Sequence, residues 1–393
     1  MLQLAAPPEH PYTPPPEAES GAALKKIGRA HCTIFDMPTL QEATENFSEY
    51  KLGEGDFGTV YKGILFDGQV VAVKTLLGGT EHGLHQLHNE VMTLAELQHK
   101  NIVRLLGFCS HQNDALLVYE YIKNGSLDKF LFDVSSRGNP LNWEQHHNII
   151  LGIAQGILYL HEDSSLRIIH RDLKANNILL DDDMEPKIAD FTLASGYMAP
   201  ENAMRGSVSP KIDVFSFGVL ALEIVTRRTN CTSDEHGTVN LLSDVWDHWT
   251  KGTVSQMLHE SLDGYARSQA LRCIHIGLLC VQPEPDDRPD ISAAVFMLTR
   301  DGMELQPPSQ PAFFGREPPP ASVSNGQNSY LCERSDFVLG RVLHWRTRIR
   351  VSEHARCKSK SGRPLVQAGR DSLPLRAHVL DEMSTEQVAQ SDE

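Results

Sequence analysis

The stretch from residue 170 to residue 177 gathers side chains that could act on a phosphate group. It reads His-Arg-Asp-Leu-Lys-Ala-Asn-Asn, and Asp190 follows thirteen residues later. Asn177 and Asp190 supply an amide oxygen and a carboxylate, which are the hard oxygen ligands that Mg²⁺ prefers. Asp172 and Lys174 add a second carboxylate and a cation two positions apart. This set of side chains indicates a site where a metal ion meets phosphate.

A glycine-rich stretch over residues 53–60 points to the same chemistry. It reads Gly-Glu-Gly-Asp-Phe-Gly-Thr-Val and fits the pattern GxGxxGxV. Glycines let a strand-turn-strand backbone approach a polyphosphate closely, because no side chain stands in the way. A strand pattern flanks each side, whereas a dinucleotide-binding unit would continue into a helix. The stretch therefore predicts a hairpin that covers phosphates.

Lys74 lies on the next predicted strand, fourteen residues past Val60, at the end of Val-Ala-Val-Lys. A lone lysine on a strand is most often a solvated charge. Glu90, however, lies on the helix predicted over residues 81–98, where it can reach that strand. This placement favours an ion pair between Lys74 and Glu90.

The elements that must position these residues change in type along the chain. Strands and tight turns are predicted over 49–75, 103–109 and 115–121, with one helix at 81–98 between them. Helical periodicity then dominates, at 143–162, 210–227, 239–248 and 266–281. Strands first and helices later predict an α+β, bilobal fold, with a small N-terminal β-rich lobe and a larger helical C-terminal lobe.

Composition bounds the domain organisation and the class of protein. The chain has 393 residues, 40% hydrophobic and 22% charged, which suits a globular protein with a substantial core. We expect a flexible Pro-rich arm, a folded domain made of two lobes, and a disordered tail. The corresponding ranges are 1–34, 35–300 (47–122 and 123–300 for the lobes) and 301–393.

Charge and cysteine usage exclude several functions. A net charge of −15 argues against a nucleic-acid partner, because neutralising phosphates requires a clustered basic surface. Seven cysteines without a CxxC pair argue against a disulfide framework and against a zinc site. No apolar run approaches the roughly 18–20 residues of a membrane span. These features predict a cytoplasmic protein without a transmembrane segment.

Taken in order, these motifs resemble the protein kinase superfamily over about residues 47–300. The finer resemblance is to plant receptor-like kinases, in particular the cytoplasmic kinase domain of the cysteine-rich receptor-like kinase family. Four segments carry it: Asn46–Ser48, Asn124–Asp128, Gly156–His161 and Cys273–Cys280. The resemblance implies an ATP- and Mg²⁺-dependent serine/threonine kinase of receptor-like cytoplasmic type, with protein substrates. It also implies a membrane receptor kinase as a partner, which would bring the chain to the inner face of the plasma membrane.

The resemblance assigns roles to the residues introduced above. Asp172 would orient the substrate hydroxyl and accept its proton, and Lys174 would steady the γ-phosphate. A lysine two residues after that aspartate is typical of serine/threonine kinases. Asn177 and Asp190 would hold magnesium. Lys74, held by Glu90, would pair with the α- and β-phosphates.

The nucleotide itself would contact the small lobe and the segment that follows it. The backbone of residues 117–122 would bond the adenine edge, and Tyr119 would limit the depth of the adenine pocket. The expected nucleotide-binding residues are Leu52, Gly53, Glu54, Gly55, Gly58, Val60, Ala72, Lys74, Glu120, Ile122 and Leu179.

Two further positions are expected to act as structural anchors. Asp213, at the start of the predicted helix 210–227, would hold the backbone of the catalytic loop, which is the stretch 170–177. Arg288 would form an ion pair with Glu201.

The stretch between Asp190 and Glu201 departs from the family pattern. These residues are eleven positions apart, whereas kinases place roughly 20–35 residues between the two motifs. Thr192 replaces the glycine of Asp-Phe-Gly, and its β-branched side chain restricts the backbone there. Thr192 and Ser195 are the only serine or threonine hydroxyls left between the motifs. The shortened activation segment 190–201 would mainly impair peptide binding and regulation.

Two alternatives to an active kinase follow from this departure. One is a pseudokinase or scaffold that binds nucleotide but transfers phosphate poorly. The other is a mis-spliced product that folds poorly.

Overall fold

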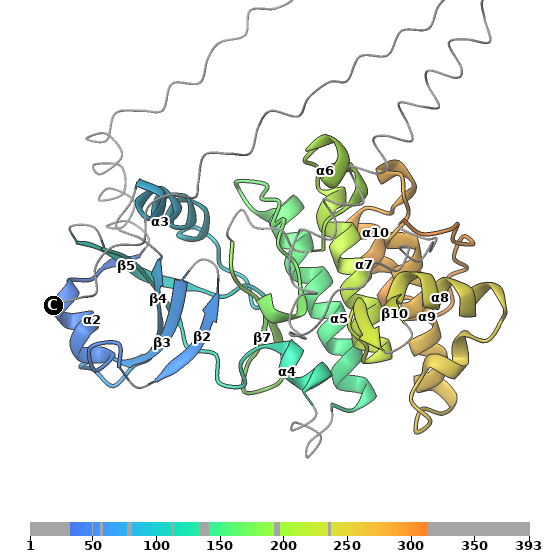
Figure 1. The fold of residues 1–393 in the computed structure, drawn as a ribbon, viewed down its shortest axis with the longest axis horizontal. Helices are drawn as coiled ribbons and strands as arrows, with labels where there is room; N and C mark the ends of the chain where they lie inside the picture. Colours follow the sequence, from blue (N-terminus) through green and yellow to red (C-terminus); the bar gives the residue numbers. More distant parts are fainter. Residues whose placement is uncertain are drawn as a thin grey trace, which may run out of the picture. The chain divides into compact units, whose positions relative to one another are not determined.

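A computed structural model describes residues 32–48, 50–55, 58–76, 81–111, 114–133, 141–191, 197–234 and 237–312 (Figure 1). Thr192 and Ser195 lie outside these residues, as do Asp56 and Phe57 of the glycine-rich stretch.

Strands from the first part of the described chain form one twisted sheet in the order β1-β5-β6-β4-β3-β2. β1 runs parallel to β5, and the other neighbours are antiparallel. Their bounds are β1 (Thr33–Ile34), β2 (Lys51–Gly55), β3 (Gly58–Ile64), β4 (Val70–Leu76), β5 (Leu105–His111) and β6 (Asp114–Glu120). Two helices accompany the sheet, α2 (Met37–Ala43), drawn in blue in Figure 1, and α3 (Glu81–Leu94), drawn in blue-green.

The later part of the chain is mainly helical, as the green to orange ribbons of Figure 1 show. Its helices are α4 (Leu127–Phe132), α5 (Trp143–Leu158), α6 (Pro200–Arg205), α7 (Lys211–Thr226), α8 (Leu241–Thr250), α9 (Gly264–Cys280) and α10 (Ile291–Thr299). Two short hairpins join them, β7 (Ile178–Leu180) with β8 (Pro186–Ile188), and β9 (Cys231–Asp234) with β10 (Gly237–Asn240). The predicted α+β fold with a β-rich and a helical lobe is confirmed.

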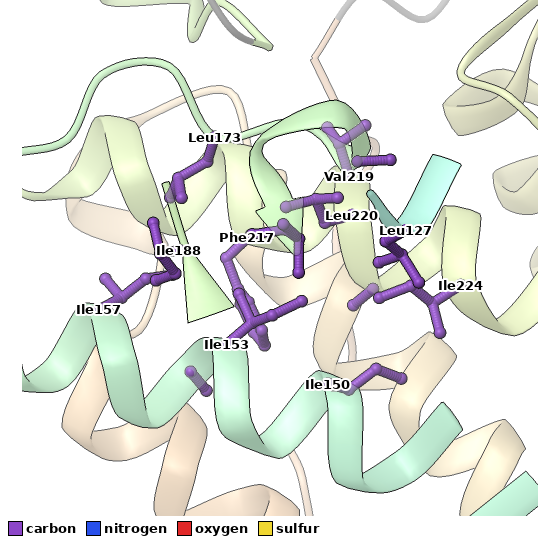
Figure 2. Close-up of a cluster of buried hydrophobic side chains, with 14 of the residues drawn as sticks. Leu127, Ile150, Ile153, Ile157, Leu173, Ile188, Phe217, Val219, Leu220 and Ile224 are labelled. Atoms are coloured by element: carbon purple, nitrogen blue, oxygen red, sulfur yellow. The ribbon is translucent and has the colours of Figure 1, made fainter. Parts of the chain in front are cut away.

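Helix α7 is the central element of the helical lobe. All of its residues from Ile212 to Thr226 are buried, so the helix has no solvent-facing stripe. Figure 2 shows Phe217 and Leu220 of α7 among side chains of α5, including Ile153. α5 begins with a capping box. The Asn142 side chain accepts from the Gln145 backbone N–H, and the Gln145 side chain accepts from the Asn142 backbone N–H.

The core also reaches the two segments that carry the candidate site. Leu173 of the 170–177 stretch and Ile188 of β8 are fully buried and lie within the cluster in Figure 2. Packing against α5 and α7 therefore fixes the backbone on either side of the predicted metal ligands.

The folded unit extends beyond the predicted boundaries at both ends. Thr33 and Ile34, predicted to belong to the flexible arm, pair with Gly107 and Phe108 of β5. At the other end Ala312, predicted to lie in the disordered tail, is buried and donates its N–H to the Val281 carbonyl. Both additions are too short and too irregular for periodicity to reveal.

The observed helix boundaries differ by a few residues from those that the hydrophobic periodicity predicts. The helix predicted over 81–98 ends at Leu94, and the last part of the one predicted over 143–162 is a π-helical turn, Tyr159–Asp163. Helices α4 and α6 have six residues each, which is too few for a periodic pattern to emerge.

Candidate active site

Asp172 lies at the centre of the candidate site and is fully buried. Its Oδ2 accepts from Asn177 Nδ2 at 2.8 Å and lies 3.3 Å from Lys174 Nζ. Its Oδ1 is also buried, and it has no hydrogen-bond partner among the described residues. Burial raises the pKa of Asp172, although Lys174 and Asn177 oppose the shift. The free oxygen can therefore accept a hydrogen bond from a further group.

Asn177 and Asp190, the two predicted metal ligands, are brought together by the backbone. Asn177 ends the 3₁₀ turn Ala175–Asn177, and its carbonyl accepts from the Ala189 N–H at 2.9 Å. Its Nδ2 donates to the Asp172 carbonyl as well as to the Asp172 carboxylate. This use of Nδ2 leaves the amide oxygen as the atom of Asn177 that could bind a metal ion. With the Asp190 carboxylate, it forms a donor set that fits Mg²⁺.

Lys74 forms the centre of a three-residue charge cluster. Its Nζ lies 2.7 Å from Asp190 Oδ1 and 3.6 Å from Glu90 Oε1, so the predicted Lys74–Glu90 pair is confirmed. Burial lowers the pKa of Lys74, but the Glu90 and Asp190 carboxylates outweigh it and raise the pKa overall. Conversely, burial raises the pKa of Asp190, but Lys74 outweighs it and keeps the pKa low. Lys74 and Asp190 are therefore both charged near neutral pH.

Glu90 has two more donors that the sequence did not reveal. Gln86 Nε2, one turn earlier in α3, donates to Oε1 at 3.1 Å, and the Tyr119 hydroxyl donates to Oε2 at 2.5 Å. Burial, followed by the charge of Glu90, raises the pKa of Tyr119 well above its usual range. Tyr119 was expected only to limit a pocket, but it also orients Glu90.

Asp213 anchors the catalytic loop as predicted. Its Oδ2 and Oδ1 accept the backbone N–H groups of His170 and Arg171, each at 2.8 Å. His161 Nε2 also lies 2.8 Å from Oδ2, a contact that the sequence did not indicate. Because Asp213 is fully buried within α7, these bonds fix the loop to the most buried helix of the lobe.

The predicted Arg288–Glu201 ion pair is also confirmed. Arg288 Nη1 and Nη2 donate to Oε1 and Oε2 of Glu201, both at 2.8 Å. The remaining guanidinium donors reach the carbonyls of Gln282, Lys211 and Pro283. The start of α6, just beyond the shortened segment, is therefore held firmly.

Comparison with known sequences agrees with this geometry. The family model described as protein tyrosine and serine/threonine kinase matches residues 47–298, which is more than half of the chain. This chain belongs to the protein kinase family.

Relatives place the kinase in the cysteine-rich receptor-like group of plants. Cysteine-rich receptor-like protein kinase 44 of Arabidopsis thaliana is 47% identical over 314 residues, which cover 74% of this chain and 83% of the relative. Cysteine-rich receptor-like protein kinase 6 of Oryza sativa subsp. japonica is 48% identical over 318 residues, 76% of this chain and 45% of the relative. Protein kinase 28 of the same group in Arabidopsis thaliana is 46% identical over 344 residues, 81% of this chain and 50% of the relative. The chain thus spans about half the length of the last two.

The residues expected to bind nucleotide in this kinase lie on five strands, except Ile122, which follows one of them. β2, β3 and β4 carry Leu52, Gly53, Glu54, Gly55, Gly58, Val60, Ala72 and Lys74. Glu120 ends β6, Ile122 follows it, and Leu179 lies on β7. β7 meets the start of α4 through a bridge between Leu179 and Ser126, which lies four residues after Ile122 in the chain. Their roles in binding stay predictions.

Protein kinases use ATP and Mg²⁺. In the part of this kinase that the structure describes, no helix is long and apolar enough to cross a membrane.

Proposed function

We propose that this chain is a serine/threonine protein kinase that transfers the γ-phosphate of ATP to protein hydroxyl groups. The observation that carries the proposal is the buried Oδ1 of Asp172, which has no hydrogen-bond partner in the described part of the chain, beside Lys174 and Asn177. A buried acceptor without a partner is costly, so it is retained where a function requires it. A substrate hydroxyl is the partner that this oxygen lacks.

Asp172 acts in this proposal as the group that orients the hydroxyl and accepts its proton. The raised pKa of Asp172 brings it closer to the range where proton transfer is effective. Lys174, one-third exposed and 3.3 Å from Asp172, is placed to neutralise charge on the transferred group.

ATP and Mg²⁺ are supported by the donor set rather than by any bound group. The Asn177 amide oxygen and the Asp190 carboxylate would hold the ion, which would neutralise phosphate charge during transfer. Lys74 is kept protonated by Glu90 and Asp190, as a phosphate-binding cation must be. The backbone at Glu120 and Ile122 would bond the adenine edge.

The non-catalytic alternative is not favoured. The positions proposed to hold the metal, the phosphates and the substrate hydroxyl all carry the required residue types, and contacts among them support a single site. The relatives are named protein kinases as well. The predicted impairment of peptide binding by the short segment between Asp190 and Glu201 concerns residues 192–196, which lie outside the described residues.

The test is transfer of radiolabelled phosphate from ATP to a generic serine/threonine substrate. We expect Asp172→Asn to reduce transfer by about 10²–10⁴-fold, because the acceptor of the proton is lost. Asp183→Asn is the matched control, since Asp183 is an exposed aspartate in the turn between β7 and β8. Transfer that persists in Asp172→Asn would remove Asp172 from this role.

A thermal-shift measurement separates binding from transfer. At about 100 times its dissociation constant, Mg-ATP should stabilise the chain by about 2.7 kcal/mol. Stabilisation without any transfer would identify a nucleotide-binding pseudokinase instead.

The cellular setting is part of the proposal. We place the kinase in the cytoplasm, acting on protein substrates and meeting a membrane receptor kinase at the plasma membrane. The receptor-like names of the relatives support this setting.

A further inference from the structure

Glu120, the last residue of β6, is tied to Arg104 by two bonds. Its backbone N–H donates to the Arg104 carbonyl at 3.0 Å, and its Oε1 accepts from the Arg104 N–H at 2.9 Å. The carboxylate therefore turns back toward the small lobe. Because Arg104 engages the Glu120 N–H, the expected bond to the adenine edge would come from the Glu120 carbonyl.

A second donor reaches the same carboxylate oxygen from the other lobe. Lys187 Nζ, on β8, lies 3.1 Å from Glu120 Oε1, although 67 residues separate the two in sequence. Both side chains are largely shielded, with 15% of Lys187 and 28% of Glu120 exposed. A shielded, hydrogen-bonded charge pair is stronger than the exposed pairs typical of protein surfaces.

The strand that carries Lys187 is positioned without help from the lysine side chain. The Ile188 N–H donates to the Asn101 carbonyl at 2.8 Å, and the Val103 N–H donates to the Ile188 carbonyl at 2.9 Å. Leu179 of β7 pairs with Lys187 in the β7–β8 hairpin. These backbone bonds fix the approach to Asp190. Loss of the Lys187 ammonium should therefore disturb Glu120 and leave Asp190 in place.

We propose that Lys187 is a positioning residue for adenine, acting through the Glu120 carboxylate. By holding Glu120 against the Arg104 backbone, the ammonium keeps the end of β6 in the conformation that the adenine edge requires. The inference rests on the proposed function, because that proposal places adenine at Glu120 and Ile122.

The experiment compares adenosine, which has no phosphate, with Mg-ATP as ligands of the full chain by calorimetry. We expect Lys187→Met to weaken both by a similar factor of about ten, the size expected for one charge-assisted hydrogen bond. The KM for ATP should rise by the same factor, and kcat at saturating ATP should stay unchanged.

Three variants make the comparison specific. Lys187→Arg keeps a cation and should restore binding of both ligands. Glu120→Gln should reproduce the loss, because it removes the charge but keeps the shape. Lys100→Met is the matched control, since Lys100 is 65% exposed and pairs with Glu185 at 3.9 Å. It should bind both ligands like the wild type.

Several results would overturn the proposal. Weaker binding of Mg-ATP with unchanged binding of adenosine would place the effect on the phosphates or the metal. Unchanged binding with a lower melting temperature would show a purely structural pair. A higher kcat with unchanged adenosine binding would show that the pair restrains motion between the lobes.

Failure of the proposed function gives a different pattern. If the wild type binds adenosine but transfers no phosphate, the proposed function fails and the binding comparison still decides the role of Lys187. If the wild type binds neither ligand, both proposals are overturned.

Discussion

Tyr119 donates its hydroxyl to Glu90 Oε2 at 2.5 Å and so joins the strand β6 to the helix α3. Glu90 is 1% exposed and also contacts Lys74. The residue expected to line the adenine pocket therefore helps to hold the glutamate that contacts Lys74, the lysine proposed to bind phosphate. The two parts of the nucleotide site are coupled through one hydrogen bond.

Removing that hydroxyl should destabilise the small lobe and the site together. In Tyr119→Phe a buried carboxylate loses a donor, which costs about 1.5–3 kcal/mol. We expect a lower free energy of unfolding and slower phosphate transfer. Denaturant unfolding and the radiolabel assay measure the two effects. Tyr121→Phe is the control, because the Tyr121 ring, which the variant keeps, makes the contact with Lys62. Equal stability of the two variants would contradict the coupling.

Gly58 should tolerate no side chain. Its φ is +141°, and an added Cβ would lie 1.8 Å from the Thr75 carbonyl oxygen of β4. We expect Gly58→Ala to separate β3 from β4, to lower the melting temperature and to weaken binding of Mg-ATP. Gly53→Ala is the matched control, because a Cβ at Gly53 meets nothing within 4 Å. A melting temperature for Gly58→Ala equal to that of Gly53→Ala would show that the hairpin rearranges freely.

Arg288→Met should be strongly destabilising, because it leaves the Glu201 carboxylate buried without its cation. Breaking one side of a buried pair costs about 3–5 kcal/mol. The double variant with Glu201→Leu should recover part of this loss, since no unpaired charge remains. Arg300→Met, on the exposed surface over Phe296, is the control. Chemical denaturation measures the free energy of unfolding of the wild type and the three variants. If Arg288→Met is as stable as the double variant, the argument from an unpaired buried charge is wrong.

Glu223 should make stability depend on pH in an unusual direction. Burial raises the pKa of Glu223 from 4.5 to about 7, although Tyr197 and the Asn230 N–H donate to it. A raised pKa in the folded state means that folding favours the protonated acid. Its contribution to stability is therefore fully present below pH 4.5 and is lost as the pH rises to about 7.

Comparison with Glu223→Gln isolates this group from the histidines that titrate in the same range. Relative to the variant, the wild type should lose about 3 kcal/mol between pH 4.5 and pH 7, as a shift of this size implies. Urea unfolding over that range measures the difference. A difference between the two proteins that does not vary with pH would mean that Glu223 titrates normally.

The two structural anchors could be predicted from the sequence, whereas several contacts of the candidate site could not. Asp213 and the Arg288–Glu201 pair were predicted because their motifs and order along the chain identify them. Gln86 and Lys187 belong to no such motif, and no local pattern distinguishes them from ordinary polar residues. His161 ends the segment Gly156–His161, but nothing in that segment indicates its contact with Asp213. Their partners lie on other elements or, for Gln86, depend on which way α3 faces.

The sequence alone determined the chemistry of the catalytic loop. Asp172, Lys174 and Asn177 lie within six residues, so a single loop conformation places them together. The alternation of strands and helices likewise determined the fold class. The spacing of residues close in sequence is enough to predict these two features, because the geometry of a loop, strand or helix fixes where nearby side chains lie.

Only the tertiary structure decided how the site is held together. Lys74 meets Asp190 across 116 residues, and Lys187 meets Glu120 across 67. Contacts of this kind depend on how the strands of the small lobe and the elements of the helical lobe pack together. Packing is a collective result of many side chains, so no local pattern in the sequence reveals which distant charges will meet.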